Sequence, residues 1–373
     1  MKKKVLFCCT VLRGHLLVFH LPYMRWFQER GYEVHVCARN DTPDSPPVIP
    51  YCDVYHELPF ERSPFSPRNR AVYRELKALI NREGFALVHC HTPVGGLLAR
   101  FAARGARRRG TKVMYTAHGF HFFRGARLVN WLLFYPAERL AARWTDVLIT
   151  INREDYARAL HFPAKRVALV PGVGVELDRF AQAEPADRAT LGVPEGCPLL
   201  LMVGELSPRK NAATALRALA KLKHSNAHLA LCGVGELQNA LHALAGELGV
   251  AERVHFLGFR SDIACVLHAA EVFVFPTWHE GLPVSLMEAM AAGLPCAVSA
   301  VRGNADLIIC GEGGLLSMPW DVDGLAANID RMLEDSALRA RMGKRNREAV
   351  QAYSLENALQ ATTALYEAVL KEG

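Results

Sequence analysis

Short apolar runs alternate with amphipathic segments along the whole chain. The runs at 5–10, 33–38 and 272–275 are rich in β-branched and aromatic residues, which is typical of buried parallel strands. Between such runs, apolar residues recur at helical spacing, as in 16–30 and 212–223. The predicted strands cover residues 5–10, 33–38, 86–90, 112–116, 146–151, 167–170, 200–203, 228–232, 254–257, 272–275 and 295–299, with a short strand near Val54. This order predicts an α/β protein built from βαβ units.

The 373 residues are too many for one ordinary core and suit two domains. Residues 172–198 contain several prolines and separate two βα series of similar size, which is typical of a linker. We therefore predict Rossmann-like domains over 1–185 and 186–352, with parallel sheets facing across a cleft. The closing helix, 353–373, is expected to pack back toward the first domain. The cleft between such domains is the expected ligand site.

The stretch 272–293 places Glu280 in a strand-to-helix turn and Glu288 on the helix that follows. The turn 281–284 would then lie at a helix N-terminus, whose unpaired N–H groups suit an anion or sugar hydroxyls. Glu280 either contacts such a ligand or only stabilises the start of the helix. Glu288, taken alone, fits a solvated helix face.

Two carboxylates are also typical of a glycosidase, in which one acts as the acid and the other as nucleophile or base. Eight helical residues at about 1.5 Å each separate the two backbones by up to ~12 Å. The carboxyl groups of glycosidases lie about 5–9.5 Å apart. The spacing therefore favours two roles on one elongated ligand, with Glu280 near the reacting group and Glu288 on a hydroxyl pair.

A second turn, at 204–211, follows the strand 200–203 and contains adjacent cations. Lys210, with Arg209 beside it, is placed to neutralise phosphate. Asn211 follows this lysine, so the turn lacks the G-x-x-x-x-G-K-[ST] order of a P-loop and a nucleoside triphosphatase is not expected. A cation and a helix N-terminus converging on diphosphate would stabilise a departing nucleotide. This favours a nucleotide-sugar donor over a hydride cofactor.

Strand ends in the first half carry a glycine and several histidines. Gly14 follows the first strand, where it either only permits positive φ or lies at the ligand-binding edge of the sheet. His118 follows the strand 112–116 and is either a ligand-facing residue or a hydrogen-bonded structural histidine. His89 and His91 lie on one face of an extended segment, but without a third ligand nearby we predict no metal there.

Charge is distributed unevenly between the two halves. Residues 1–185 hold 28 Lys and Arg against 16 Asp and Glu, whereas residues 186–373 hold 16 against 21. The first half therefore suits an anionic partner. Within it, the segment 125–144 combines an aromatic and apolar run with arginines and is expected to break at Pro136. This segment is either a buried helix pair with charged ends or a surface that dips into the membrane interface.

Several classes of protein are not expected. The ten cysteines include no C-x-x-C pair, which indicates thiols in a reducing cytoplasm. The apolar run that ends at Arg13 is predicted to be the first strand rather than a signal peptide, and no segment has about 18 uninterrupted apolar residues. We predict a cytoplasmic protein with peripheral association at the inner face of the membrane as an option. The arginines follow no nucleic-acid-binding motif, so no nucleic-acid partner is expected.

The motifs GELSPRKN, HFLGFRSD and EGLPVSLME resemble the donor-domain motifs of glycosyltransferase family 4. HCHTPVGG, YTAHGFHF and DVLITINREDY resemble its capsule and exopolysaccharide branch, so the resemblance covers nearly the whole chain. It implies a GT-B fold and a retaining, metal-independent enzyme without a cofactor. The implied reaction moves a hexose or N-acetylhexosamine from a UDP-sugar to a glycan or an undecaprenyl-diphosphate-linked glycan.

The same resemblance implies a donor-binding second domain and an acceptor-binding first domain. Lys210, with Arg209, would hold the donor diphosphate, Glu280 would touch the donor sugar, and His118 would face that sugar from the acceptor side. The other implied donor contacts are Gly14 near the diphosphate, Phe259, Arg260 and Ile263 near the base, the turn residues Gly281, Leu282, Pro283 and Val284, and Glu288 at the ribose hydroxyls. Many relatives carry arginine where Glu205 stands here, so a second cation would have to be Arg209.

Three other activities suit a two-domain protein of this kind. A nucleotide-sugar epimerase would consume the donor without an acceptor. A glycogen-type phosphorylase would need phosphate or a cofactor-binding lysine, which the sequence does not identify. A non-catalytic nucleotide-sugar-binding protein would bind the donor without turnover, so only a measurement of turnover separates it from an enzyme.

Overall fold

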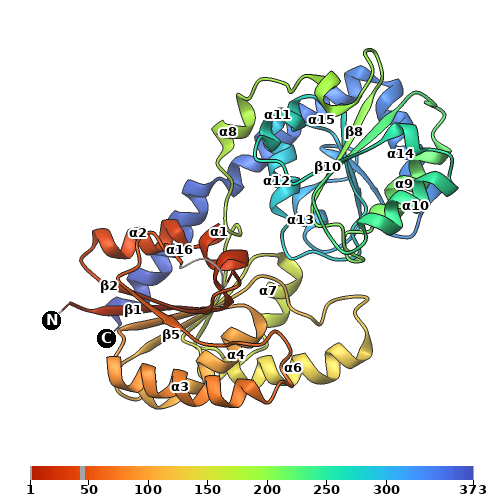
Figure 1. Cartoon of the computed structure of the whole chain (residues 1–373). Coiled ribbons are helices and arrows are strands. Elements are labelled where there is room, and N and C mark those ends of the chain that lie inside the picture. Colours follow the sequence, from red (N-terminus) through yellow and green to blue (C-terminus); the bar gives the residue numbers. More distant parts are fainter. Residues whose placement is uncertain (1, 43–46, 373) are drawn as a thin grey trace. The chain divides into compact units, whose positions relative to one another are not determined.

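The computed structural model describes residues 2–42 and 47–372. Contacts divide the chain into two compact units, which are Met1–Val173 with Glu356–Gly373, and Gly174–Leu355 (Figure 1). The first unit thus ends before residue 185, where the sequence suggests a boundary. Most of the closing helix α16 (Leu355–Lys371) is grouped with that first unit.

In the first unit, the described residues form a seven-stranded parallel sheet in the order β3-β2-β1-β4-β5-β6-β7. Its strands are β1 (Lys4–Val11), β2 (Glu33–Arg39), β3 (Val54–Glu57), β4 (Leu87–His91), β5 (Lys112–Ala117), β6 (Val147–Thr150) and β7 (Arg166–Leu169). Each one overlaps a predicted strand, so the predicted α/β class is confirmed for this half.

Helices cover both faces of this sheet. They are α1 (Leu17–Phe19), α2 (Leu21–Glu29), α3 (Arg68–Glu83), α4 (Pro93–Ala102), α5 (Arg104–Arg107), α6 (Leu128–Ala142), α7 (Arg153–Ala159) and α16. Figure 1 shows α2 and α16 on one face and α3, α4 and α6 on the other. The buried Tyr366 of α16 packs against Phe27 and forms a hydrogen bond with His89. The distance between the Tyr366 hydroxyl and His89 Nδ1 is 2.7 Å. His89 is thus a core residue.

Two helices of this unit differ from the predicted ones at proline residues. The expected helix 16–30 is divided, because Pro22 has no N–H for the preceding turn: the chain makes a π-turn at Leu12–Leu16, then α1, and starts again with α2. Pro136, by contrast, lies inside a continuous α6, so the expected break is wrong. One missing backbone bond does not end that helix, whose buried Glu138 is held by an ion pair of 2.7 Å to Arg100.

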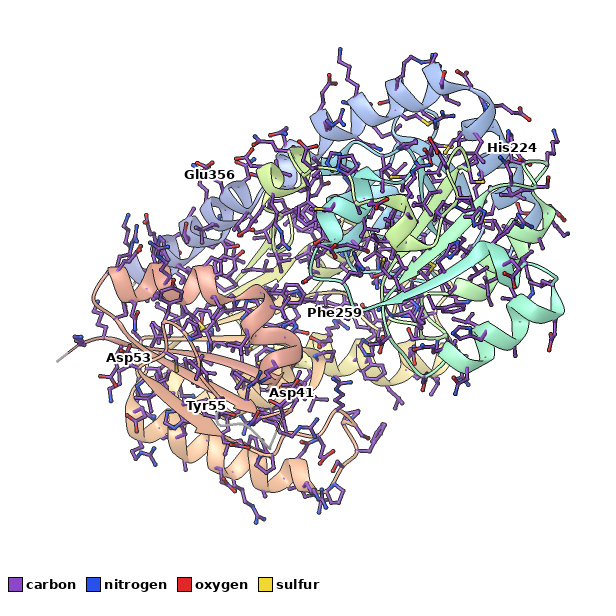
Figure 2. All side chains as sticks on the ribbon, turned by 45° about the horizontal axis from the view of Figure 1, so that its top comes forward. Asp41, Asp53, Tyr55, His224, Phe259 and Glu356 are labelled. Carbon is purple, nitrogen blue, oxygen red and sulfur yellow. The ribbon has the colours of Figure 1, made fainter. Side chains whose placement is uncertain are left out.

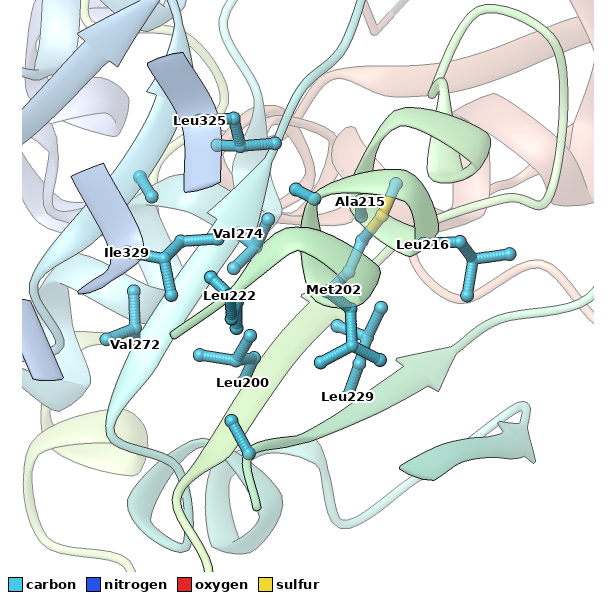
Figure 3. Packing of buried hydrophobic residues seen from close by; sticks show 14 of the residues in the cluster. Leu200, Met202, Ala215, Leu216, Leu222, Leu229, Val272, Val274, Leu325 and Ile329 are labelled. Atoms are coloured by element: carbon cyan, nitrogen blue, oxygen red, sulfur yellow. The ribbon is translucent and has the colours of Figure 1, made fainter. Parts of the chain in front are cut away.

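In the second unit, the described residues form a six-stranded parallel sheet in the order β10-β9-β8-β11-β12-β13. Its strands are β8 (Leu199–Val203), β9 (His228–Cys232), β10 (Val254–Gly258), β11 (Val272–Phe275), β12 (Cys296–Ser299) and β13 (Gly314–Ser317). All but β13 were predicted. Leucines and valines of β8, β9 and β11 pack against α9 and α14 in the core shown in Figure 3.

The helices of this unit again lie on both sheet faces. They are α8 (Leu177–Ala181), α9 (Ala212–Lys221), α10 (Gln238–Glu247), α11 (Ile263–His268), α12 (Val284–Ala292), α13 (Asn304–Leu307), α14 (Val322–Glu334) and α15 (Ser336–Ala349). Helix α8 lies within the predicted linker, yet its Phe180 is buried and α8 packs against α12. No helix in the described part of the chain is long and apolar enough to cross a membrane.

Strand order fixes where each sheet can bind a ligand. The order reverses between β1 and β4 in the first sheet and between β8 and β11 in the second. The loops that leave the carboxyl ends of two such strands run in opposite directions and leave a crevice at the edge of the sheet. Each unit therefore has one expected binding edge, formed by the loops after those strands.

Candidate active site

In the second unit, the loops after β8 and β11 meet around the carboxylate of Glu280. Its Oε1 accepts hydrogen bonds from Arg209 Nη1 at 2.6 Å, Lys210 Nζ at 2.8 Å and Thr277 Oγ1 at 2.9 Å. Glu280 and Lys210 are only 7% and 8% exposed. Two cations thus share one carboxylate oxygen, which leaves positive charge available to an anion at this edge.

The Lys210 side chain occupies a confined space. Its ammonium lies 4.5 Å from the centre of the Phe275 ring. A Cβ at Gly204 would come within 3.3 Å of the lysine Cε, so a side chain there would press on it. Burial lowers the pKa of Lys210, and the nearby Glu280 carboxylate opposes that shift.

Two polar residues that sequence reasoning missed join the two loops. Asn211 donates from Nδ2 to the carbonyls of Pro276 and Pro319, at 2.8 Å each. The Thr277 hydroxyl, whose one proton is shared with Glu280, also lies 3.0 Å from the carbonyl oxygen of Arg209. Asn211 has φ 59°, a left-handed conformation that asparagine tolerates better than most residues. Its residue type was therefore the signal in the sequence that could have indicated its role.

The turn 280–283 leads directly into the N-terminus of α12. Amides of the first helical turn have no acceptor within the helix, and Pro283 offers no side-chain cap. Arg302 holds the turn in place, since its Nε donates a hydrogen bond to the backbone carbonyl of Glu280 at 2.8 Å. A Cβ at Gly303 would lie 2.7 Å from the carbonyl oxygen of Gly281. Leu282 is buried beneath the turn.

Glu288, on the next turns of α12, is a partly buried carboxyl. Burial raises its pKa to about 7, an effect that Arg179 partly offsets. Across residues 2–42 and 47–372, no side chain or amide makes a hydrogen bond or ion pair with this carboxyl. The oxygens of Glu288 can therefore accept hydrogen bonds from a ligand. A residue that only belonged to a solvated helix face would need no such ligand.

The three residues implied for base binding lie around the turn after β10. Phe259 is 82% exposed, and Figure 2 shows it projecting from that turn. Arg260 forms a two-bond ion pair with Asp262, at 2.8 and 2.6 Å. Ile263 starts α11 and is half-buried. The exposed aromatic face of Phe259 suits the stacking of a planar base.

In the first unit, the amides after β1 already hold a carboxylate. Asp41, labelled in Figure 2, accepts from the amides of Arg13 at 2.7 Å and Gly14 at 2.8 Å. Burial acts to raise the pKa of Asp41, but the bonds from these amides outweigh it and the pKa is lowered. The turn at Gly14 is thus an anion-binding position that a side chain of the same unit fills.

His118 belongs to a group of histidines at the binding edge of the first sheet. Its Nε2 lies 3.4 Å from Nδ1 of His91, the last residue of β4. The full group, called the histidine cluster below, is His15, His20, His91 and His118. The expectation that His91 has no further histidine nearby is therefore wrong, because the partners come from distant segments of the chain.

Comparisons with known proteins bear on both units. Residues 183–349 match the family model for glycosyl transferases group 1, and residues 23–179 match that for glycosyltransferase family 4. The chain is 40% identical over 378 residues to the putative glycosyltransferase EpsD of Bacillus subtilis, covering 99% of this chain and 98% of that protein. This chain belongs to the family 4 glycosyltransferases.

The glycosyltransferase is also 30% identical over 317 residues to an Escherichia coli UDP-Gal:alpha-D-GlcNAc-diphosphoundecaprenol alpha-1,3-galactosyltransferase, covering 80% of this chain and 81% of that protein. Among solved structures, Anabaena HepE in complex with UDP and glucose matches with a TM-score of 0.80 and 19% identity, over 98% of this chain and all of that one. The predicted family, the class of activity as a glycosyltransferase and the GT-B fold are confirmed.

Proposed function

We propose that this glycosyltransferase moves a hexose or N-acetylhexosamine from a UDP-sugar to a glycan or an undecaprenyl-diphosphate-linked glycan, in surface polysaccharide biosynthesis. The observation that carries the proposal is the pair of cations, Arg209 and Lys210, on one oxygen of Glu280 beside the start of α12. The E. coli relative, named for a UDP-sugar donor and a diphosphoundecaprenol acceptor, supports both substrate classes.

In this proposal the donor diphosphate lies between the cations and the first amides of α12. Lys210 and Arg209 make charge-assisted bonds to phosphate oxygens. The backbone N–H groups of residues 281, 282 and 284 add hydrogen bonds and the positive end of the helix dipole. The uridine ribose donates its two hydroxyls to Glu288, and the base stacks near Phe259. Gly14 approaches the diphosphate in place of Asp41, whose carboxylate leaves the amides that it occupies.

The proposed reaction retains the configuration of the donor sugar without an enzymic nucleophile. The acceptor oxygen forms its bond to the anomeric carbon on the face from which the phosphate leaves, and the acceptor proton passes to that phosphate. The enzyme then acts by positioning and by stabilising charge on the leaving diphosphate. Glu280 orients Lys210 and the donor sugar, and His118 bounds the sugar on the acceptor side. No metal ion is required for these steps.

We propose further that α6 lets the enzyme bind peripherally to a membrane that holds a lipid-linked acceptor. Four apolar residues near its start, Leu128, Val129, Leu132 and Leu133, are exposed. Arg127 precedes them directly, so a basic group accompanies the apolar surface. Apolar side chains flanked by arginine are typical of surfaces that enter the headgroup region of anionic membranes.

The test is a panel of UDP-, GDP- and ADP-sugars, measured first by thermal stabilisation and then by turnover. A UDP-sugar should raise the melting temperature most, since a ligand at 100 times its Kd stabilises the native state by about 2.7 kcal/mol. UDP should be released only when an acceptor is present, and NMR of the product linkage should show the donor's anomeric configuration. Donor consumption without acceptor would indicate an epimerase, and stabilisation without turnover a binding protein.

A further inference from the structure

The histidine cluster gathers four imidazoles from three separate segments at the binding edge of the first sheet. His15 and His20 follow β1, and His91 ends β4, so these come from the two strands between which the strand order reverses. The fourth, His118, follows β5. One ring nitrogen from each lies within 4.8 Å of those from the other three. Such a grouping depends on the fold and is not visible as a sequence motif.

The closest separations in the cluster match those of nitrogens around a tetrahedral ion. Nε2 of His15 lies 3.2 Å from Nε2 of His20, and Nε2 of His118 lies 3.4 Å from Nδ1 of His91. A tetrahedral zinc ion with Zn–N bonds of about 2.0–2.1 Å holds its nitrogens about 3.3–3.4 Å apart. Two edges of a coordination tetrahedron are therefore already formed.

The cluster also contains polar atoms that the described residues leave unsatisfied. Nδ1 of His20 and Nε2 of His91 are buried without a hydrogen-bond partner in the described part of the chain. Their residues are 2% and 0% exposed. A buried polar atom without a partner is unfavourable, because it has lost its hydrogen bonds to water. An ion held by Nε2 of His20 and Nδ1 of His91 would leave the two atoms without partners as N–H groups, because each imidazole gives one nitrogen to the ion.

The close packing of the four imidazoles favours their neutral form, which is the form that binds metals. The rings of His20 and His91 are stacked with centroids 3.8 Å apart, which two protonated rings would oppose. Neutral rings do not have to lose a proton before they bind an ion.

We propose that the histidine cluster binds one divalent transition-metal ion of the class that prefers imidazole, such as Zn²⁺ or Ni²⁺. The set has no carboxylate among its four members, so it does not suit Mg²⁺ or Ca²⁺, which prefer oxygen ligands. An ion held there engages the ring of His118. Inhibition of sugar transfer by that ion is a consequence that rests on the proposed function, whereas the binding itself does not.

The experiment measures binding of Zn²⁺ to the full chain after treatment with a chelator, by competition with a chromophoric chelator. We expect one equivalent bound, no competition by excess Mg²⁺, and tetrahedral Co²⁺ absorption bands when Co²⁺ is used instead. His15→Gln and His20→Gln should each weaken Zn²⁺ binding at least tenfold. Two variants are used because either residue can be needed for folding, which circular dichroism checks.

The control is His255→Gln in the second unit. His255 forms a pair with His228, with 2.8 Å between Nε2 and Nδ1, and the two rings are stacked. This variant also removes one imidazole of a close pair, and it should leave Zn²⁺ binding unchanged. A wild-type chain that binds no Zn²⁺, or whose binding is weakened as much by His255→Gln as by the cluster variants, would overturn the proposal. Neither result would alter the donor and turnover tests.

Discussion

Glu280 combines a structural and a proposed functional role in one carboxylate. It neutralises part of the charge of Arg209 and Lys210, and through them it connects the loop after β8 with the loop after β11. Charges with this little exposure to water are costly when they lose their partner, because the remaining group stays desolvated. The same side chain therefore bears on both stability and donor binding.

Replacing Glu280 with Gln should lower both stability and transfer. Gln keeps the size and one acceptor but removes the charge, so Lys210 is left buried beside Arg209, and we expect a loss of about 2–3 kcal/mol in urea unfolding. Transfer should fall at least tenfold. The matched control is Asp323→Asn, which removes the same charge from the exposed pair with Lys221 and should cost less than about 1 kcal/mol. Equal losses for the two variants would contradict the role of Glu280.

Glu288 should make UDP binding depend on pH. Its pKa is raised to about 7, so its contribution to stability is fully present below the ordinary value near 4.5 and is lost as the pH rises through about 7. If only the carboxylate accepts from the ribose hydroxyls, UDP should bind about tenfold more weakly at pH 6 than at pH 8.

The control for this difference in UDP affinity is Glu288→Gln, which is needed because the phosphates of UDP also titrate near pH 6. The variant should lose the part of the pH dependence that belongs to the carboxyl. Glu367→Gln, at an exposed glutamate of α16, should keep the wild-type profile. A calorimetric profile that is the same in Glu288→Gln and in the wild type would remove Glu288 from the ribose site.

At the scale of elements, glycines let the turns after β8 and β9 approach each other. A Cβ at Gly233 would lie 1.9 Å from the carbonyl oxygen of Gly204, and one at Gly235 would lie 2.4 Å from that of Leu206. Gly233 also has φ +151°, which L side chains rarely adopt. The position of the turn that carries Lys210 thus depends on the absence of side chains in the neighbouring turn.

We therefore expect Gly233→Ala to destabilise the protein by more than about 2 kcal/mol and to weaken UDP binding, because the backbone of the turn at 204–206 must move. Urea unfolding and calorimetry measure the two effects. Gly246→Ala is the control, since nothing lies within 4 Å of a Cβ at this position of α10. That variant should stabilise by about 0.5–1 kcal/mol. A neutral Gly233→Ala would show that the two turns are not closely packed.

Helix α6 allows a test of the membrane proposal. Leu132→Glu places a charge among the exposed leucines of this helix and should reduce cosedimentation with anionic vesicles severalfold. Ile309→Glu makes a comparable change at an exposed apolar residue of the second unit and should not. Vesicles of neutral lipid should bind the wild type less. Equal cosedimentation of the two variants would mean that α6 does not enter the membrane.

At the scale of the whole molecule, local pattern predicted most of the fold. The run 272–275 is recognisable because β-branched and aromatic residues end at a proline, and the structure has β11 there. Strand β13 (Gly314–Ser317) was not predicted because its four residues, GLLS, carry little strand signal and are held by pairing with β12. The break before α2 follows from Pro22 itself, whereas the continuity of α6 through Pro136 depends on neighbouring packing, which sequence pattern does not contain.

The candidate site, like the fold, could be predicted only in part from local sequence pattern. The turns that carry Lys210 and Glu280 follow from glycine and proline positions, and the structure joins these side chains at 2.8 Å. The parts that were missed come from long-range proximity. Asn211 reaches the carbonyl of Pro319, and His15 and His20 approach His91, across separations in the chain that no local motif records.

The central claim is that Lys210 binds the diphosphate of a UDP-linked donor, and calorimetric titration with UDP and UMP tests it most directly. The wild type should bind UDP at least tenfold more tightly than UMP, because only UDP carries the second phosphate for Lys210 to engage. Lys210→Ala should lose most of this preference, whereas Lys221→Ala, at an exposed lysine of α9, should keep it. A preference for UDP that survives intact in Lys210→Ala would contradict the account.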